Sequence, residues 1–344
     1  MTTVNSISGG KTSSYMAVHH PADVTLFALV TIDDVSCRPS DPGLVKSVSE
    51  KIGKEFIATA ESDKTLKVVL DLEQMIGREI VWLVEDSFEQ TIKRQGGILP
   101  NMMLRFCTQK MKMKPIFDYC HNNYGKVLMN IGFRYDEIER SYRQNNKFKT
   151  VVGKHPSGRN KWAEIEWREC RYPLIETKTT HYEVKTWALK SGLTFPPDSN
   201  CVGCFHKPIQ QLRKNFEDEP EKMRWFSNQE VMAKSGKRRL QWKKEMTYDK
   251  IKEIGLQTDF FFGTGSGCQA GFCTDLTRDM KEPSTLLQLV IAELKVREER
   301  GLNKYGTTLD RTDLTEKQWL QHAYEEALDL ALYLKKLIES HDAR

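Results

Sequence analysis

Short apolar runs of strand length alternate with longer amphipathic runs through the first 134 residues. Runs whose apolar residues recur three and four positions apart predict helices, and the short apolar runs predict strands. Such alternation is typical of a parallel sheet with helices on both faces. The predicted strands are residues 2–7, 24–33, 55–60, 79–85 and 126–132, and the predicted helices are 13–20, 46–53, 65–77 and 107–124.

The pattern changes after residue 134. Residues 140–171 are polar and basic, which predicts a hairpin or long loop that either contacts a polyanion or is simply solvated. Helices are predicted at 180–192 and across 208–255, and a glycine-rich segment precedes two amphipathic helices at 283–301 and 315–340. The sequence therefore predicts three domains: a sheet domain at 1–207, a helical, cysteine-containing extension at 208–280 and a C-terminal α-helical hairpin at 281–344.

Composition narrows the class of protein. With 39% hydrophobic and 29% charged residues, the chain fits a globular protein, and its net charge of +5 permits anionic ligands without requiring nucleic acid. No apolar run approaches the roughly 18 residues of a membrane span, and no basic segment precedes an apolar stretch at the N-terminus. We therefore expect a cytoplasmic protein without membrane association. Its eight cysteines are expected to be thiols or metal ligands rather than disulfides.

The first predicted strand leads into Ser8-Gly9-Gly10-Lys11-Thr12-Ser13, and a predicted helix follows. Two glycines allow the backbone to turn tightly and bring its N–H groups close to an anion. Hydroxyl groups, the Lys11 charge and the helix N-terminus add further attraction for phosphate. The spacing of a Walker A loop is absent. An ordinary glycine turn is the other interpretation of this segment on its own.

Other candidate residues follow predicted strands. Asp33 and Asp34 end the second strand, and Gly132-Phe133-Arg134 follows the strand at 126–132. Ligands of parallel sheets bind at the carboxyl ends of the strands. The glycine loop, Asp33 and Arg134 are therefore expected to lie at one edge of the sheet.

Several segments carry a family resemblance. Ser8–Ser13 resembles the PP-loop of N-type ATP pyrophosphatases, with Thr12 where aspartate is usual. The segment from Arg105 to Pro115 resembles the Arg-x-Cys-Thr-x-x-x-Lys segment of phosphoadenosine phosphosulfate (PAPS) reductase-like proteins, and residues 132–140 are similar to that family's Gly-x-Arg-x-x-Glu-x-x-Arg. Tyr172-Pro173-Leu174-Ile175 is similar to the Tyr-Pro-Leu-Ile segment of the same family. The resemblance covers residues 1–207 and implies the adenine-nucleotide α-hydrolase fold, a doubly wound parallel sheet.

The resemblance implies a nucleotide-binding domain and an ATP-dependent reaction. The loop would hold the β,γ-phosphates of ATP with Mg²⁺ while a substrate oxygen attacks the α-phosphate and pyrophosphate leaves. We assign charge stabilisation in this step to Lys11, Lys112 and Arg134. The acceptor is expected to be a nucleic acid or a nucleotide. The expected nucleotide-binding residues are Ser8, Gly9, Gly10, Lys11, Thr12, Ser13, Asp33, Lys110, Gly132, Arg134, Glu137 and Arg140.

Cysteines provide the candidate metal site. Cys201-Val-Gly-Cys204 is an incomplete metal motif, and Gly203 would let the chain fold round an ion. The resemblance puts Cys107 near the same face, and some thiolation enzymes of the wider family hold [4Fe–4S] with three cysteines, leaving one iron open for sulfur. Cys273 is the candidate fourth ligand. A zinc site formed by Cys201, Cys204, Cys268 and Cys273 is the alternative.

Two other functions stay open at this point. A sulfonucleotide reductase is one, although PAPS reductases carry a Ser-Ser-Ser-Phe-Gly loop and a C-terminal Glu-Cys-Gly-x-His segment that this chain lacks. A nucleotide- or nucleic-acid-binding protein with structural zinc and no turnover is the other. The leading prediction is an iron–sulfur enzyme that adenylates its acceptor and takes part in sulfur transfer.

The two terminal helices carry acidic residues, with Glu326 and Asp329 on one helical face. Lys304-Tyr305-Gly306 resembles a segment of MazG-like nucleotide pyrophosphohydrolases, whose acidic helices bind Mg²⁺. The Glu-Glu-x-x-Glu of the first helix in that family is missing here. We therefore expect these helices to form a packing hairpin through which the chain forms a homodimer.

Overall fold

The computed structural model describes residues 1–232, 240–255 and 314–342, together with 293, 296, 297, 299, 302 and 303. The chain divides into two compact units, residues 1–276 and 277–344. The first unit contains the sheet, and the second contains the helix α13 (Glu316–Asp342). The three predicted domains divide the chain more finely than these two units do.

Five parallel strands form the main sheet, in the order β5-β2-β1-β6-β9. They are β1 (Thr3–Ile7), β2 (Val24–Ala28), β5 (Ile80–Leu83), β6 (Val127–Asn130) and β9 (Arg168–Arg171). The chain adds β2 and β5 on one side of β1 and then returns to add β6 and β9 on the other. The predicted α/β class with a parallel sheet is confirmed, and the strand order is compatible with a doubly wound fold.

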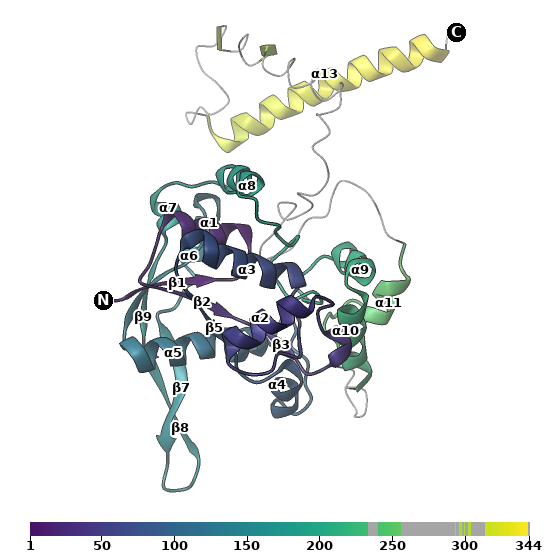
Figure 1. Ribbon diagram of the computed structural model, residues 1–344. Helices are drawn as coiled ribbons and strands as arrows, with labels where there is room; N and C mark the ends of the chain where they lie inside the picture. The colour runs from purple at the N-terminus through teal and green to yellow at the C-terminus, as the bar shows by residue number, and fades with distance from the viewer. Residues whose placement is uncertain are drawn as a thin grey trace. The chain divides into compact units, whose positions relative to one another are not determined.

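Alternate residues of the strands face opposite layers of helices (Figure 1). Ile7 and Phe27 pack with the helices α1 (Lys11–His19), α2 (Pro42–Ile52) and α3 (Asp63–Ile76). Val4 and Leu26 pack on the other face with α5 (Lys114–Tyr124). Strands buried on both faces read as largely apolar runs, as in Val-Thr-Leu-Phe-Ala of β2, whereas β9 at the edge of the sheet is Arg-Glu-Cys-Arg and partly exposed.

Two predicted elements are interrupted. The predicted strand at 24–33 leaves the main sheet after Ala28, and β3 (Thr31–Ile32) pairs antiparallel with β4 (Ala58–Thr59) in a small second sheet. The predicted helix at 107–124 begins as a π-helical segment, η2 (Thr108–Met113), before α5 starts at Lys114. π-Helical turns are often found at functional sites because they re-aim side chains.

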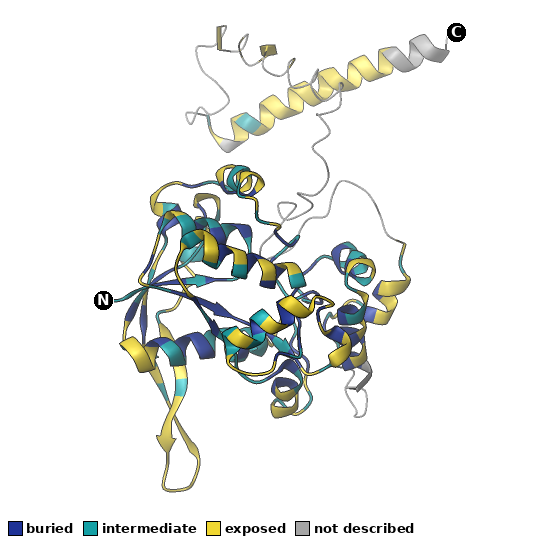
Figure 2. Cartoon of the chain, viewed as in Figure 1, coloured by how far each residue is buried: buried dark blue, intermediate teal, exposed yellow. Residues whose placement is uncertain are grey.

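The basic segment forms a hairpin. Strands β7 (Lys147–Lys154) and β8 (Asn160–Glu166) pair antiparallel as a separate ribbon, so a hairpin is present within residues 140–171, as predicted. The hairpin is shorter than the predicted segment, because residues 168–171 form β9 of the main sheet. Phe148 at its base packs on the core beneath α5. The rest of the ribbon is largely exposed and projects beyond the sheet (Figures 1 and 2).

Three helices after residue 207 belong to the first unit and share a hydrophobic cluster with its small sheet. These are α9 (Ile209–Asp218), α10 (Pro220–Met232) and α11 (Tyr248–Glu253). Their buried aromatic residues share one cluster with Ile32 and Ala58 of the small sheet. This cluster includes Phe226, which has Trp242 and Tyr248 as ring neighbours.

The remaining segments of the first unit connect these elements. They are η1 (Val35–Cys37), α4 (Phe88–Arg94), η3 (Tyr135–Glu137), α6 (Ile138–Ser141), α7 (Pro173–Glu176) and α8 (His181–Lys190). In the second unit, α13 matches the helix predicted at 315–340, while most of the helix predicted at 283–301 lies outside the described residues. Among the helices that the structure describes, none is long and apolar enough to cross a membrane.

Candidate functional site

The glycine loop lies between the end of β1 and the start of α1. Gly9 has a left-handed φ of +69°, and a Cβ there would lie 2.6 Å from the Thr65 methyl carbon, so any side chain would both strain the backbone and clash with α3. The Ser13 hydroxyl donates to the Gly10 carbonyl at 3.0 Å and accepts from the Ser8 N–H at 3.1 Å. The loop is thus closed on itself by hydrogen bonds.

The helix α1, which follows the loop, has no capping side chain on its N-cap residue. Gly10 is the N-cap of α1 and has no side chain to accept from the first N–H groups, and the first turn contains no acidic residue. Lys11, the first residue of the helix, is 8% exposed. The N–H groups of a first helical turn and the positive end of the helix dipole favour an anionic ligand at this position.

Residues after β6 meet the glycine loop at the point where the strand order reverses. Gly132 packs on the loop so closely that a Cβ there would lie 3.4 Å from the Ser13 Cα. The largely buried Arg134 side chain donates from Nη1 to the Thr12 hydroxyl at 2.9 Å. The structure therefore brings together Gly132, Arg134 and the loop, as the sequence predicted, at the usual ligand site of such sheets.

Carboxylates hold Arg134 in place. Its Nε lies 3.2 Å from Asp136 Oδ1, and its Nη1 lies 3.2 Å from Glu137 Oε2. Glu137 also forms an ion pair with Arg140, whose guanidinium lies 4.4 Å from the centre of the Phe133 ring. Glu137 and Arg140 thus position the residues after β6.

His181 is a residue of this neighbourhood that the sequence analysis did not select. It begins α8, and burial, with a further contribution from the Arg134 charge, lowers its pKa. The Lys11 charge also lowers the pKa of His181, so the charged groups of Lys11 and Arg134 both lie near this imidazole. These two positive charges favour an anionic ligand.

The cysteine turn approaches the loop from another segment. A Cβ on Gly10 would lie 2.8 Å from both Cβ and Oγ of Ser199, two residues before Cys201. Asp198, the residue before Ser199, forms an ion pair with Lys207 at 2.9 Å, and both side chains are largely buried. The glycine loop and the Cys201–Cys204 segment are therefore neighbours, which no local sequence pattern reveals.

Backbone hydrogen bonds fix the turn that carries Cys201 and Cys204. The Val202 N–H donates to the Ala60 carbonyl at 2.7 Å, and the Asn215 amide donates to the Val202 carbonyl at 2.7 Å. The Tyr248 hydroxyl donates to the Gly203 carbonyl at 2.9 Å. The small sheet, α9 and α11 therefore hold this turn from three directions.

Gly203 is placed by packing. A Cβ at this position would lie 2.3 Å from Phe226 Cγ, so the ring lies directly against the glycine backbone. From the sequence, we expected Gly203 to let the chain fold round a metal ion. The structure supplies a different physical reason, close approach of an aromatic ring in a buried cluster.

An ion pair joins η2 to Glu61, which follows β4 and lies beside the cysteine turn. Lys112 Nζ donates to Glu61 Oε1 at 2.7 Å, and Glu61 is fully buried with no hydrogen-bond partner for Oε2. Burial alone would lower the pKa of Lys112, but Glu61, with a further contribution from the nearby Cys201, raises it overall. The lysine therefore stays protonated beside the cysteine turn.

The three predicted ligands Cys107, Cys201 and Cys204 come from two segments and lie close enough to affect one another's ionisation. Burial raises the pKa of each thiol, and the Lys112 charge opposes this rise at Cys201. Soft thiols in this number suit zinc or iron. Among the described residues, however, no three Cys, His, Asp or Glu side chains are arranged as a metal site. Cys273 lies outside the described residues.

The predicted nucleotide-binding residues Asp33 and Lys110 lie on other segments of the chain. Asp33 accepts from the Ser87 hydroxyl at 2.5 Å, and its N–H donates to Glu89 at 3.1 Å, because β3 has left the main sheet. Its hydrogen bonds thus join β3 to α4. Lys110 lies in η2, two residues before Lys112.

Comparisons with known proteins give limited information. No protein-family model matches the chain. An uncharacterized protein of Methanocaldococcus jannaschii is 29% identical over 113 residues, which is 32% of this chain and 23% of that protein. The match covers less than a quarter of the relative and assigns no activity to this chain.

Proposed function

We propose that this protein is an ATP-using PP-loop enzyme of the PAPS reductase-like family, with the adenine-nucleotide α-hydrolase fold, that adenylates an acceptor and releases pyrophosphate. The proposal depends chiefly on the contact of the glycine loop with Gly132 and Arg134 at the reversal point of the parallel sheet. An uncapped helix N-terminus and the buried Lys11 lie at the same place. A triphosphate fits this combination of N–H donors and positive charge.

Each part of the loop has a physical role in this reaction. The N–H groups around Gly10 and the Lys11 ammonium would hold the β,γ-phosphates of ATP with its Mg²⁺. Arg134, fixed by Asp136 and Glu137, would stabilise charge on the α-phosphate while an acceptor oxygen attacks and pyrophosphate leaves. Catalysis of this kind consists mainly of positioning and charge stabilisation.

The second part of the proposal concerns the cysteines. Cys107, Cys201 and Cys204 would hold an iron–sulfur cluster, with zinc as the alternative metal and Cys273 as the candidate fourth ligand. When bound by three thiolates, a [4Fe–4S] cluster supplies one open iron for a sulfur species. The chemistry of the three thiols fits such a group, and Lys112 would balance the negative charge of the thiolates.

A pyrophosphate-release assay tests the first part. Protein purified without oxygen would be incubated with Mg²⁺, ATP and candidate nucleic acids or nucleotides, and its iron and zinc contents would be measured. Lys11→Ala should abolish pyrophosphate release, whereas Lys46→Ala, on the exposed side of α2, should leave it unchanged. ATP binding that is the same in Lys11→Ala and the unmodified protein would contradict the proposal.

A further inference from the structure

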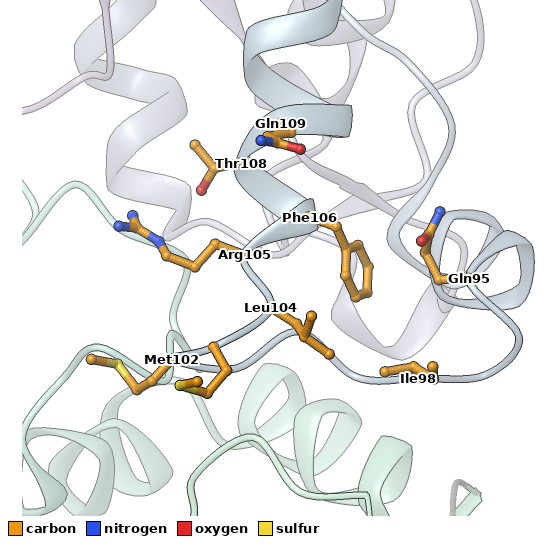
Figure 3. Close-up of a pocket in the computed structure, with 9 residues that line it drawn as sticks. Gln95, Ile98, Met102, Leu104, Arg105, Phe106, Thr108 and Gln109 are labelled. Atoms are coloured by element: carbon orange, nitrogen blue, oxygen red, sulfur yellow. The ribbon is translucent and has the colours of Figure 1, made fainter. Parts of the chain in front are cut away.

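A surface groove with a volume of about 640 Å³ is lined by residues on either side of Cys107 in the sequence (Figure 3). It lies between the end of α4, the loop that follows and the first turn of η2. Phe106 and Thr108 both line it, so Cys107 stands between two lining residues in the sequence. Its volume is within the usual range for small-molecule sites, about 300–1,000 Å³.

The walls of the groove are apolar, although they face solvent. Met102 is 54% exposed, Met103 is 90% exposed and Leu104 is 49% exposed. A hydrogen-bonded turn holds them there, since Asn101 Oδ1 accepts from the N–H groups of Met103 and Leu104 at 2.9 and 3.1 Å. Contiguous apolar groups held at the surface in this way indicate a binding site.

Amide, guanidinium and aromatic side chains also line the groove. Gln95 and Gln109 provide amides, Arg105 provides a guanidinium, and Phe106 provides an aromatic ring. None of the described residues that line the groove is acidic. Amides hydrogen-bond to the edges of bases, aromatic rings and thioethers contact their faces, and arginine binds phosphate.

We infer that this groove binds a nucleobase, stacked on Phe106 and hydrogen-bonded by Gln95 or Gln109, with Arg105 contacting its phosphate. The inference rests on the proposed function, because the acceptor would bind at residues that flank the predicted ligand Cys107 in the sequence. The base belongs either to a single-stranded nucleic acid or to a free nucleotide. The groove chemistry is the same for both.

Fluorescence of a purine analogue whose emission falls on stacking tests this inference. The full-length protein would be titrated with the analogue in a single-stranded oligonucleotide and, separately, as its nucleoside monophosphate. We expect quenching, and about a tenfold loss of affinity in Phe106→Ala, because one base stacked on an aromatic ring contributes about that factor or more. Phe106→Tyr should retain affinity, and Tyr182→Ala, which removes an exposed ring on α8, serves as the control.

The two probes separate the sources of the base. Quenching of the oligonucleotide alone indicates a nucleic acid acceptor, and Arg105→Gln should then weaken binding and reduce its dependence on salt. Equal affinity for the monophosphate indicates a free nucleotide. No quenching of either probe, or quenching that Phe106→Ala leaves unchanged, overturns the inference and favours a protein partner for the exposed methionines. ATP affinity, measured in parallel by calorimetry, reports separately on the proposed function.

Discussion

Gly10 of the glycine loop and Ser199, two residues before Cys201, lie in direct contact, with space for no Cβ on the glycine. The two residues are far apart in the sequence. Gly10 belongs to the predicted nucleotide site, and Ser199 precedes the predicted metal ligand Cys201. Their contact makes the two proposed sites adjacent, as a single acceptor for both would require.

This contact gives a first prediction. Gly10→Val should lower ATP affinity more than tenfold, because its side chain would displace the backbone that must approach phosphate and would clash with Ser199. Isothermal titration calorimetry measures the loss. Gly255→Ala, at a position with open space around it, is the control. The double change Gly10→Val and Ser199→Gly should still bind ATP weakly, and full recovery would show that the loop backbone does not contact phosphate.

The buried pair of Lys112 and Glu61 gives a second prediction. Lys112→Met should lower the free energy of unfolding by about 2–4 kcal/mol, because it leaves a buried carboxylate without its partner. Urea denaturation checks this value. Adding Glu61→Met should recover part of the loss, as expected for two coupled residues. The more exposed Lys114 is the matched control, and Lys114→Met should cost less than about 1 kcal/mol.

The thiols give a third prediction. Replacing Cys107, Cys201 or Cys204 by Ser should lower the iron content of anaerobically purified protein and remove its visible absorbance. Cys120 is buried in the separate core beneath α5, and the buried Cys37 thiol donates to the Glu221 carbonyl, so replacement of either should leave the iron content unchanged. Metal analysis checks the result. Cys273→Ser distinguishes ligation by three cysteines from ligation by four.

Stoichiometric zinc without iron would contradict the iron–sulfur part of the proposal. Zinc bound by the same thiolates would be colourless and redox-silent. Full iron content in all three variants would instead place the cluster elsewhere in the chain. Neither result would affect the prediction for the glycine loop, because ATP binding is measured independently.

Gly203 and Phe226 give a fourth prediction. Gly203→Ala should destabilise the protein by about 1–3 kcal/mol, because its methyl group would overlap the Phe226 ring. Thermal and urea denaturation measure this loss. If the clash is the cause, Gly203→Ala should cost much less in a Phe226→Leu background than in the unmodified protein. An equal cost in both backgrounds would show that the ring does not limit the space at this position.

The C-terminal unit gives a fifth prediction. Tyr324, Leu328 and Leu332 of α13 are exposed apolar residues at intervals of four positions, which fits a packing stripe on one helix. Removal of residues 277–344 should leave ATP affinity unchanged and, if the helices form the expected homodimer, should convert the dimer into a monomer in sedimentation. A truncated protein that folds but no longer binds ATP would show that the first unit does not form the site alone.

The sequence determined the elements that depend on neighbours in the chain. Buried parallel strands read as apolar runs, so β1, β5 and β6 were predicted close to their observed bounds, and β2 was predicted with its correct start at Val24. The glycine loop and Arg134 were predicted to meet because parallel strands end at one edge, and they do. Local patterning and one topological rule suffice for these features.

Only the tertiary structure decided which side chains share an environment. Asp33 turns toward Ser87, because β3 separates from the main sheet, and Lys112 pairs with Glu61 at the cysteine turn. Ser199 and His181 become neighbours of the loop through folding of segments far along the chain. These contacts depend on how separate elements cross and pack, and the periodicity of one segment carries no information about its distant neighbours.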